Sequence, residues 1–218
     1  MGYNIAIDGP AGAGKSTIAK LVAKKKGYIY VDTGAMYRGL AVHFIKKGIQ
    51  PEEKEKIAEA CEDAVIKIAY ENGVQQVYLN DENITGSLRE EAVGNMASKS
   101  SGIPAVRAKL LELQRNLAKE ENVVMDGRDI GTHVLPNADV KVYLTASVET
   151  RAKRRFDELT EKGVACDFDA IASDIKERDE RDMTRDIAPL KQADDAVLVD
   201  SSDMTIDEVT EAIINLCK

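Results

Sequence analysis

A glycine-rich segment near the start of the chain has the residue types and spacing needed to bind a polyphosphate. It consists of Gly9, Pro10, Ala11, Gly12, Ala13, Gly14, Lys15, Ser16 and Thr17, which fit the pattern Gly, four residues, Gly-Lys-Ser/Thr. Glycines let the backbone curl so that N–H groups face phosphate oxygens, and a helix that begins near Lys15 adds its positive dipole end. We expect Lys15 to reach the outer phosphates and the Ser16 hydroxyl to bind Mg²⁺ directly. The alternative, a chance glycine-rich turn, is disfavoured by the strand-like Ile5-Ala6-Ile7 before it.

A second candidate segment is Asp126-Gly127-Arg128-Asp129-Ile130-Gly131-Thr132. It follows an apolar run, so Asp126 is expected at a strand end, where its carboxylate can hold Mg²⁺ through water. Arg128 and Asp129 lie on a glycine-flanked turn. They can serve a ligand, or they can form an internal salt bridge.

A third candidate segment is Asp32-Thr33-Gly34-Ala35-Met36-Tyr37-Arg38, which follows the apolar run 29–31. A helix N-terminus with an arginine in its first turns can hold a second phosphate, and Tyr37 can border a base. The plainer interpretation is a helix cap followed by a surface arginine.

Arginines gather in two later segments. Arg178, Arg181, Asp182 and Arg185 fall on one face if residues 170–185 are helical, and Arg151, Arg154 and Arg155 repeat the arrangement on the preceding helix. Like charges on one face repel unless anions lie between them. Because the turn Glu161-Lys162-Gly163 joins the two segments, we interpret them as a lid that closes over phosphates, with Arg154 and Arg155 approaching them. The alternative is a solvated face of ordinary ion pairs.

The elements that must position these residues alternate between short apolar runs and helical patterns. This alternation predicts an α/β fold with a five-stranded parallel sheet flanked by helices, whose ligands bind at the carboxyl ends of the strands. Residues 65–70 and 74–79 alternate in polarity around Glu71-Asn72-Gly73, which predicts a small antiparallel insert. The expected strands are Asn4–Asp8, Ile29–Asp32, Val123–Asp126, Val140–Leu144 and Ala196–Asp200.

Composition narrows the class of protein further. The chain has 218 residues and a net charge of −8, so we expect a single domain and no nucleic-acid or membrane partner. Cys61, Cys166 and Cys217 are few and far apart, which favours free thiols in a reducing cytoplasm. We expect no signal peptide and no membrane span, and we take a monomer as the default.

Taken together, these segments resemble the bacterial cytidylate kinase (CMP kinase) family, a branch of the nucleoside monophosphate kinases with a P-loop. The resemblance runs essentially end to end, and its DGRDIGT and IKERDERD stretches are far more specific than the phosphate loop. It implies a P-loop NTPase-type fold over residues 1–218, a small antiparallel NMP-binding insert near 62–100 and a helical lid near 150–186.

The resemblance also implies roles for individual positions. Catalytic roles fall to Lys15, Arg128, Arg185 and Arg154, and Arg155 joins the phosphate loop in binding ATP. The residues implied to bind CMP are Ser98, Arg107 and Asp129 for cytosine, Arg38, Arg128 and Arg185 for the phosphate, Tyr37 and Thr33 beside it, and Arg178 and Asp182 at the ribose.

The implied reaction is the conversion of Mg-ATP and CMP, or dCMP, into ADP and the diphosphate by direct in-line transfer. The attacking phosphate oxygen is already an anion, so no general base is needed and neither His43 nor His133 is expected to be catalytic. Two alternatives remain. One is another small-molecule kinase, such as a shikimate-type kinase. The other is a nucleotide-dependent switch or binding module, although the sequence holds no Asn-Lys-x-Asp motif and no ABC signature.

Overall fold

The computed structural model describes residues 2–217, which fall into two compact units. One unit joins residues 2–30 to the chain from residue 121 onward, and the other comprises residues 31–120. The chain passes from the first to the second within strand β2, Ile29–Asp32. We describe each unit by itself.

A five-stranded sheet in the order β2-β6-β1-β7-β8 forms the framework of the first unit. β1 is central and pairs in parallel with β6 on one side and β7 on the other. The prediction of a parallel sheet is confirmed, and each predicted strand boundary lies within one residue of the observed one. The remaining strand bounds are β1 Asn4–Asp8, β6 Val123–Gly127, β7 Val140–Thr145 and β8 Val197–Asp200.

Helices α1 (Lys15–Lys26) and α8 (Ile206–Ile214) pack against each other and share the core of this unit. Ile7, Val22 and Ile213 contribute to that core and are fully or almost fully buried. α1 ends at Lys26, and the Gly27 that caps it has a left-handed φ of 69°. The Tyr28 N–H then donates to the Ala23 carbonyl at 2.9 Å, as in a Schellman cap.

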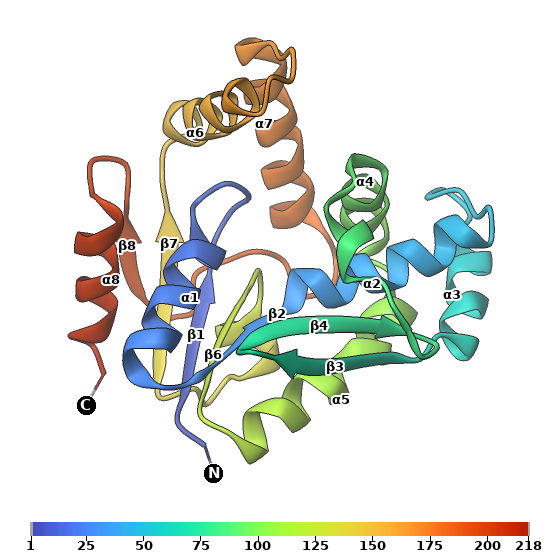
Figure 1. The fold of residues 1–218 in the computed structure, drawn as a ribbon, viewed down its shortest axis with the longest axis horizontal. Helices are drawn as coiled ribbons and strands as arrows, with labels where there is room; N and C mark the ends of the chain where they lie inside the picture. The colour runs from blue at the N-terminus through green and yellow to red at the C-terminus, as the bar shows by residue number, and fades with distance from the viewer. Residues whose placement is uncertain (1, 218) are drawn as a thin grey trace. The chain divides into compact units, whose positions relative to one another are not determined.

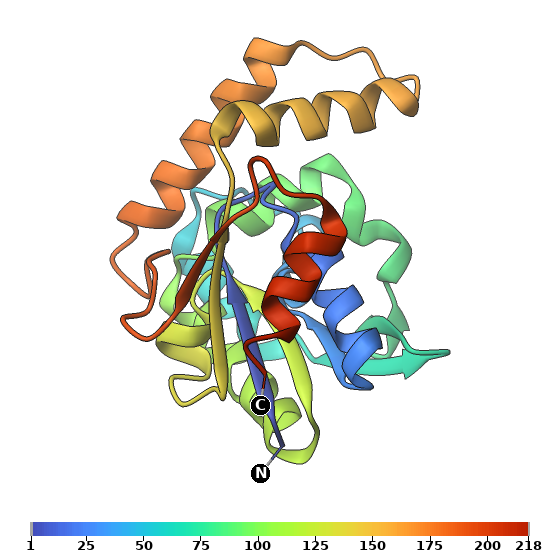
Figure 2. The same cartoon turned by 90° about the vertical axis from the view of Figure 1, so that its left-hand side faces the viewer.

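Two long helices, α6 (Val148–Glu161) and α7 (Phe168–Thr184), follow strand β7. They contact each other where they cross, and Figures 1 and 2 show α6 leaving the end of β7 and the chain returning through α7 at an angle to it. The turn between them contains Gly163, with φ of 70°. A hairpin of two helices therefore stands at the carboxyl edge of this sheet.

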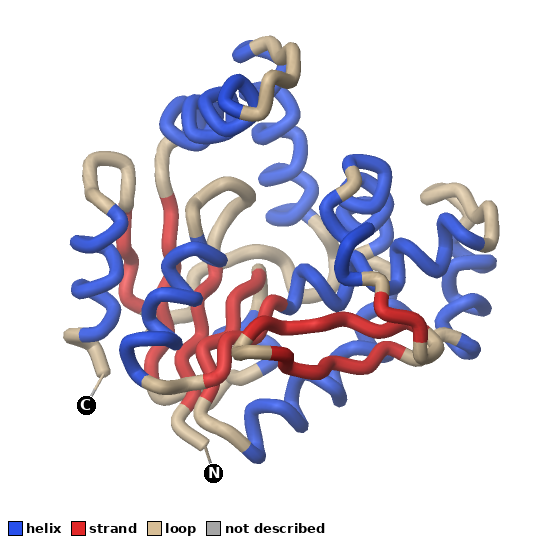
Figure 3. The backbone as a smooth tube through the Cα atoms, in the orientation of Figure 1, coloured by secondary structure: helices blue, strands red, loops and turns tan. Residues whose placement is uncertain are grey.

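The second unit combines four helices with a small antiparallel sheet, whose strands are red in Figure 3. Asn72 and Gly73 both have positive φ, 52° and 75°, which suits the tight turn predicted between β3 and β4. A third strand, β5 (Glu82–Asn83), adds to the two strands that the sequence predicts. The other bounds are α2 Thr33–Lys46, α3 Lys54–Asp63, β3 Ile66–Glu71, β4 Val74–Leu79, η1 Thr85–Arg89, α4 Glu91–Ser100 and α5 Pro104–Glu120.

Within residues 2–217, no helix combines the length and the apolar character that crossing a bilayer would require.

Candidate active site

The phosphate loop connects β1 to α1, as its sequence predicts. Gly9 has φ of 149°, and a Cβ atom there would lie 1.9 Å from the carbonyl oxygen of Leu144 on β7. Only glycine fits this approach, so the first residue of the motif is fixed by the neighbouring strand as well as by the turn. Gly14 caps α1 with φ of 87°, which directs the first N–H groups of the helix into the loop.

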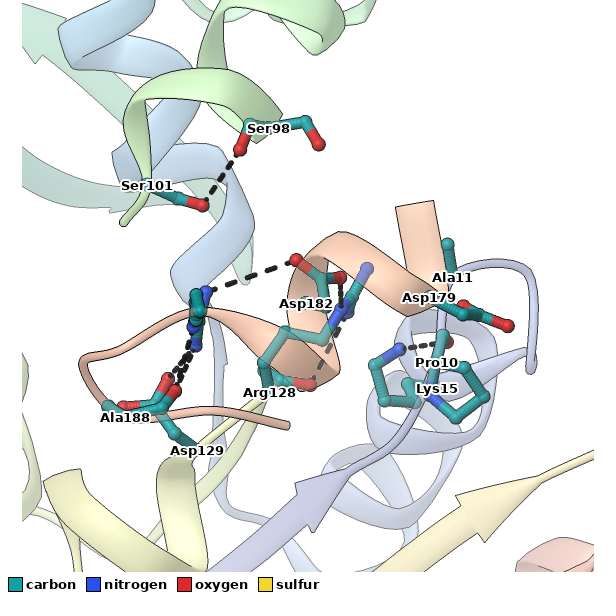
Figure 4. Close-up of polar contacts among 12 residues, drawn as sticks. Pro10, Ala11, Lys15, Ser98, Ser101, Arg128, Asp129, Asp179, Asp182 and Ala188 are labelled. Atoms are coloured by element: carbon teal, nitrogen blue, oxygen red, sulfur yellow. Dashed lines mark hydrogen bonds and ion pairs between the residues drawn. The ribbon is translucent and has the colours of Figure 1, made fainter. Parts of the chain in front are cut away.

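Lys15 is buried beneath this loop. Its Nζ donates to the Pro10 carbonyl at 2.7 Å, a contact drawn in Figure 4. Burial, followed by the nearby positive charge of Arg128, lowers the pKa of Lys15 to about 7, although the carboxylates of Asp126, Asp182 and Asp8 oppose the shift. The positive charge of Arg128 so near the buried Lys15 favours an anionic ligand.

Ser16 and Asp126 lie side by side. The Ser16 hydroxyl donates to Asp126 Oδ2 at 3.0 Å, and the Tyr30 hydroxyl donates to Asp126 Oδ1 at 2.9 Å. No cluster of three or more His, Cys, Asp or Glu residues suited to a metal occurs in the described part of the chain. A hydroxyl and one carboxylate nevertheless fit Mg²⁺ carried in on phosphates, because this ion keeps most of its water and needs few protein ligands. Our sequence analysis missed Tyr30, since only the packing of the sheet brings it to Asp126.

Asp8, the last residue of β1, holds the turn that follows β6. Its two carboxylate oxygens accept the N–H groups of Ile130 and Gly131, each at 2.7 Å. Burial raises the pKa of Asp8 to about 6, against the opposing effect of these two hydrogen bonds. Our sequence analysis placed Asp8 only at the end of its strand, at the edge of the sheet where ligands are expected. The structure gives it a definite role there, because it fixes the backbone just after Asp129.

Arginines and carboxylates alternate around that turn. Arg128 Nε donates to Asp182 Oδ2 at 2.8 Å, as Figure 4 shows, and Arg185 contacts Asp129 Oδ1 at 3.2 Å. Burial would raise the pKa of Asp182, but Arg128, Arg185 and Arg178 together hold it below its ordinary value. Arg128 thus pairs with a residue of α7, and Asp129 pairs with the residue just beyond that helix. Both residues therefore form salt bridges within the protein, as the alternative interpretation expects.

We predicted that Arg178, Arg181, Asp182 and Arg185 share one face of a helix, and this prediction is wrong for Arg185. The helix stops at Thr184, and Arg185 takes an extended conformation with ψ of 142°. Its guanidinium then donates to the Ala188 carbonyl through Nε at 2.8 Å. The chain leaves the helix one residue before the prediction required, and this turn directs Arg185 to Asp129.

The arginines of α6 divide into three environments, so the prediction that they share one phosphate-facing surface is wrong for Arg151. That side chain is only 4% exposed and contacts protein groups on several sides. Arg154 donates to the Ser201 carbonyl at 2.7 Å, next to the end of β8. Arg155 is exposed and pairs with Glu158 at 2.8 Å on its own helix. The phosphate roles of Arg154 and Arg155 stay predictions.

In the unit of residues 31–120, Asp32 caps α2. Its Oδ1 accepts the Ala35 N–H at 2.8 Å, and its Oδ2 contacts Arg38 at 3.0 Å. The capping interpretation of this segment is therefore confirmed. Arg38 also retains a buried Nε with no hydrogen-bond partner among the described residues, which leaves it able to bind an anion. Thr33, the first residue of α2, is buried.

Three further predicted residues of this unit are connected to one another. The Arg107 guanidinium lies 5.8 Å from the centre of the Tyr37 ring and donates to the Ser101 carbonyl at 3.3 Å. The Ser101 hydroxyl in turn donates to the Ser98 carbonyl at 3.0 Å (Figure 4). Helices α2, α4 and α5 thus bring Tyr37, Ser98 and Arg107 into one connected group.

Comparisons with known proteins agree with the resemblance. The family model described as cytidylate kinase matches residues 5–218. The cytidylate kinase of Caldicellulosiruptor saccharolyticus is 51% identical over 98% of this chain and 94% of its own length. That of Shouchella clausii is 48% identical over 100% of this chain and 96% of its own length.

A solved structure of a shikimate kinase from Acinetobacter baumannii is similar in fold. It has a TM-score of 0.50 and 16% identity, and the match covers 99% of this chain and 93% of that one. This likeness shows a shared P-loop α/β architecture and nothing about the substrate. With the family model spanning residues 5–218 and relatives about half identical along nearly their whole length, this chain belongs to the cytidylate kinase family.

Proposed function

We propose that this chain transfers the γ-phosphoryl group of ATP to the phosphate of CMP, and also of dCMP, giving ADP and the nucleoside diphosphate. The observation that carries the proposal is the gathering of two cations, the buried Lys15 and the half-buried Arg128, beside a phosphate loop in a chain of net charge −8. The relatives named cytidylate kinase supply the choice of acceptor.

The phosphate loop is proposed to bind ATP, the phosphoryl donor. Its N–H groups and the N-terminus of α1 bind the β- and γ-phosphates, and Lys15 exchanges the Pro10 carbonyl for a phosphate oxygen. Ser16 would hold Mg²⁺ directly and Asp126 through water, and the bound ion would neutralise charge on the donor phosphates. Arg154 and Arg155 approach the same phosphates when α6 and α7 close.

The acceptor phosphate is proposed to bind Arg38, Arg128 and Arg185. Each of these arginines pairs with a carboxylate in the structure: Arg38 with Asp32, Arg128 with Asp182, and Arg185 with Asp129. Such pairs keep the guanidinium groups oriented in the absence of substrate, so less ordering is needed when the phosphate arrives. Arg178 and Asp182 are proposed to contact the ribose, with Thr33 and Tyr37 beside the phosphate.

Recognition of cytosine is proposed to rest on Ser98, Arg107 and Asp129. Cytosine carries an amino donor where uracil carries a carbonyl acceptor. The Asp129 carboxylate would therefore accept a hydrogen bond from the amino group of cytosine and repel the carbonyl oxygen of uracil. A site built on hydrogen bonds rejects the wrong base strongly, because the mismatch leaves buried polar groups unpaired.

The chemistry requires positioning and charge stabilisation rather than proton abstraction. The attacking phosphate oxygen is an anion at neutral pH, which distinguishes this reaction from transfer to a hydroxyl. The proposed reaction therefore assigns no proton transfer to His43 or His133. His43 is buried and its Nε2 lies 3.0 Å from Asp63 Oδ1, which accounts for it as a structural residue of α2.

A coupled assay of ADP formation with CMP, dCMP, UMP, AMP and shikimate tests the proposal directly. We expect the highest kcat/KM with CMP and dCMP. Turnover of UMP equal to that of CMP would contradict the proposed recognition of cytosine. A preference for AMP or shikimate would move the chain to a different kinase activity, and the absence of transfer to any acceptor would favour a nucleotide-binding module.

We also propose that the protein works as a monomer in the cytoplasm, without nucleic-acid or membrane partners. The negative net charge supports this, as do Cys61, Cys166 and Cys217, which are all free thiols. Sedimentation of the purified protein with and without ATP tests the oligomeric state.

A further inference from the structure

Arg151, one turn into α6, is a buried cation that the proposed mechanism does not use. Its guanidinium makes three contacts with three different segments. Nε donates to the Ala146 carbonyl at 2.9 Å, just after β7, and one terminal nitrogen donates to the Ala11 carbonyl at 2.9 Å, within the phosphate loop. The other terminal nitrogen lies 2.7 Å from Asp179 Oδ2 on α7.

The contact with Ala11 bears on the direction of a neighbouring N–H group. The described chain contains no cis peptide bond, and in a planar trans peptide the carbonyl of one residue and the N–H of the next point in opposite directions. By holding the Ala11 carbonyl, Arg151 therefore fixes where the Gly12 N–H points. The stem of Arg151 packs there too, since a Cβ on Gly12 would lie 3.3 Å from Arg151 Cβ.

The contact with Asp179 bears on α7. Asp179 is 8% exposed, and its second oxygen, Oδ1, is buried with no hydrogen-bond partner among the described residues. A buried carboxylate with so few partners depends heavily on the cation beside it. α7 also carries Arg178 and Asp182, so the attachment of Asp179 to Arg151 constrains the helix that presents them.

We propose that Arg151 is a positioning residue for phosphoryl transfer. One guanidinium sets the orientation of the phosphate-loop backbone at Ala11–Gly12 and ties that loop to α7 through Asp179. The inference rests on the proposed function, because it assigns the loop to ATP. It predicts that a change in Asp179, which pairs with the terminal nitrogen of Arg151 that does not contact Ala11, weakens ATP binding through Arg151.

Two conservative variants test this without removing a buried side chain. Arg151→Lys keeps the charge but cannot reach three partners, and Asp179→Asn keeps the shape but removes the charge of the pair. The readout is the Kd of a fluorescent ATP analogue, measured without CMP and well below the unfolding temperature. Loss of a charge-assisted hydrogen bond predicts a rise in Kd of about tenfold for Arg151→Lys and a smaller rise for Asp179→Asn.

The matched control is Lys153→Met. Lys153 is an exposed cation of the same helix, paired with Asp157 at 3.1 Å, and its loss should leave the Kd unchanged. The double variant Arg151→Lys/Asp179→Asn should bind ATP better than the product of the two single effects predicts, because both act through one contact.

A lower unfolding temperature with an unchanged Kd in both variants would overturn the inference, since a merely structural ion pair behaves in that way. Multiplicative effects in the double variant would overturn the link between the loop and α7. If the parent protein itself fails to bind the ATP analogue, the proposed function falls and this inference falls with it, whereas normal binding by the parent confines any failure to Arg151.

Discussion

Substitution of Tyr30 by phenylalanine should raise the Mg²⁺ concentration that the reaction requires while leaving the nucleotide site intact. The change removes one hydroxyl and keeps the ring, which also lies 5.5 Å from the Lys20 ammonium. Asp126 then loses the donor at Oδ1 and keeps the Ser16 hydroxyl at Oδ2. The carboxylate can rotate away from the orientation that we propose for holding a metal-bound water.

The expected size follows from this single contact. A hydrogen bond to a charged group contributes about 1.5–3 kcal/mol, and about 1.4 kcal/mol corresponds to a tenfold change in an equilibrium constant. Partners that orient metal-binding side chains typically account for about 10–100-fold in metal affinity or activity. We therefore expect the Mg²⁺ concentration that gives half-maximal turnover to rise by about tenfold or more.

The assay is an Mg²⁺ titration of ADP formation at fixed ATP and CMP, paired with the affinity for a fluorescent ATP analogue in the presence of a metal chelator. Tyr28→Phe is the control, because its ring packs against Tyr3 with centroids 5.9 Å apart. An unchanged Mg²⁺ midpoint in Tyr30→Phe would refute the reasoning. Equal losses of analogue affinity with and without metal would do the same, because the effect would then lie in the loop and not at Asp126.

Four other changes have expected outcomes. Lys15→Ala should lower kcat by about 100-fold or more with an unchanged circular dichroism spectrum, and full activity would remove Lys15 from the donor site. Asp129→Asn should reduce the preference for CMP over UMP by at least about tenfold, measured as a ratio of kcat/KM values. Arg185→Ala should lower turnover far more than ATP affinity, and a selective loss of ATP binding would assign it to the donor. Burial raises the pKa of Asp8 from 3.8 to about 6, so the folded protein holds this proton more tightly than the unfolded chain does, and the free energy of unfolding falls as the pH rises from about 4 to about 6. Urea unfolding should therefore show the parent losing about 2–3 kcal/mol relative to Asp8→Asn between pH 4 and pH 8, and a flat difference would contradict the shift.

The parts of the site that depend on local sequence could be predicted. The phosphate loop is one contiguous segment, and its glycines, its lysine and the helix after it sit where the motif requires. The strand ends were equally accessible, because an apolar run that stops at an aspartate is a local signal. The capping of α2 by Asp32 belongs to the same class, since the acceptor and the donor are three residues apart.

What could not be predicted arises from contacts between distant segments. Spacing placed Arg151 on a phosphate-facing surface, but Ala11 and Asp179 come from segments 140 and 28 residues away and bury it. Tyr30 looks like an ordinary strand residue until β6 brings Asp126 to its hydroxyl. Periodicity also cannot show where a helix ends, which is why Arg185 was placed on α7 rather than just beyond it.

The interruption of one unit by residues 31–120 has a consequence for how the chain folds. Asn4 on β1 must find Val123 on β6, and the Ile29 N–H must find the Asn122 carbonyl, although residues 31–120 lie between the two partners in each case. Closing so long a connection is slow if it stays flexible, since non-local pairing forms only after the entropy of closure has been lost. A segment that collapses into its own compact unit shortens the distance its two ends must search. Early collapse of residues 31–120 would therefore accelerate formation of the central sheet, and mutations in its interior would slow refolding without touching a single strand of that sheet.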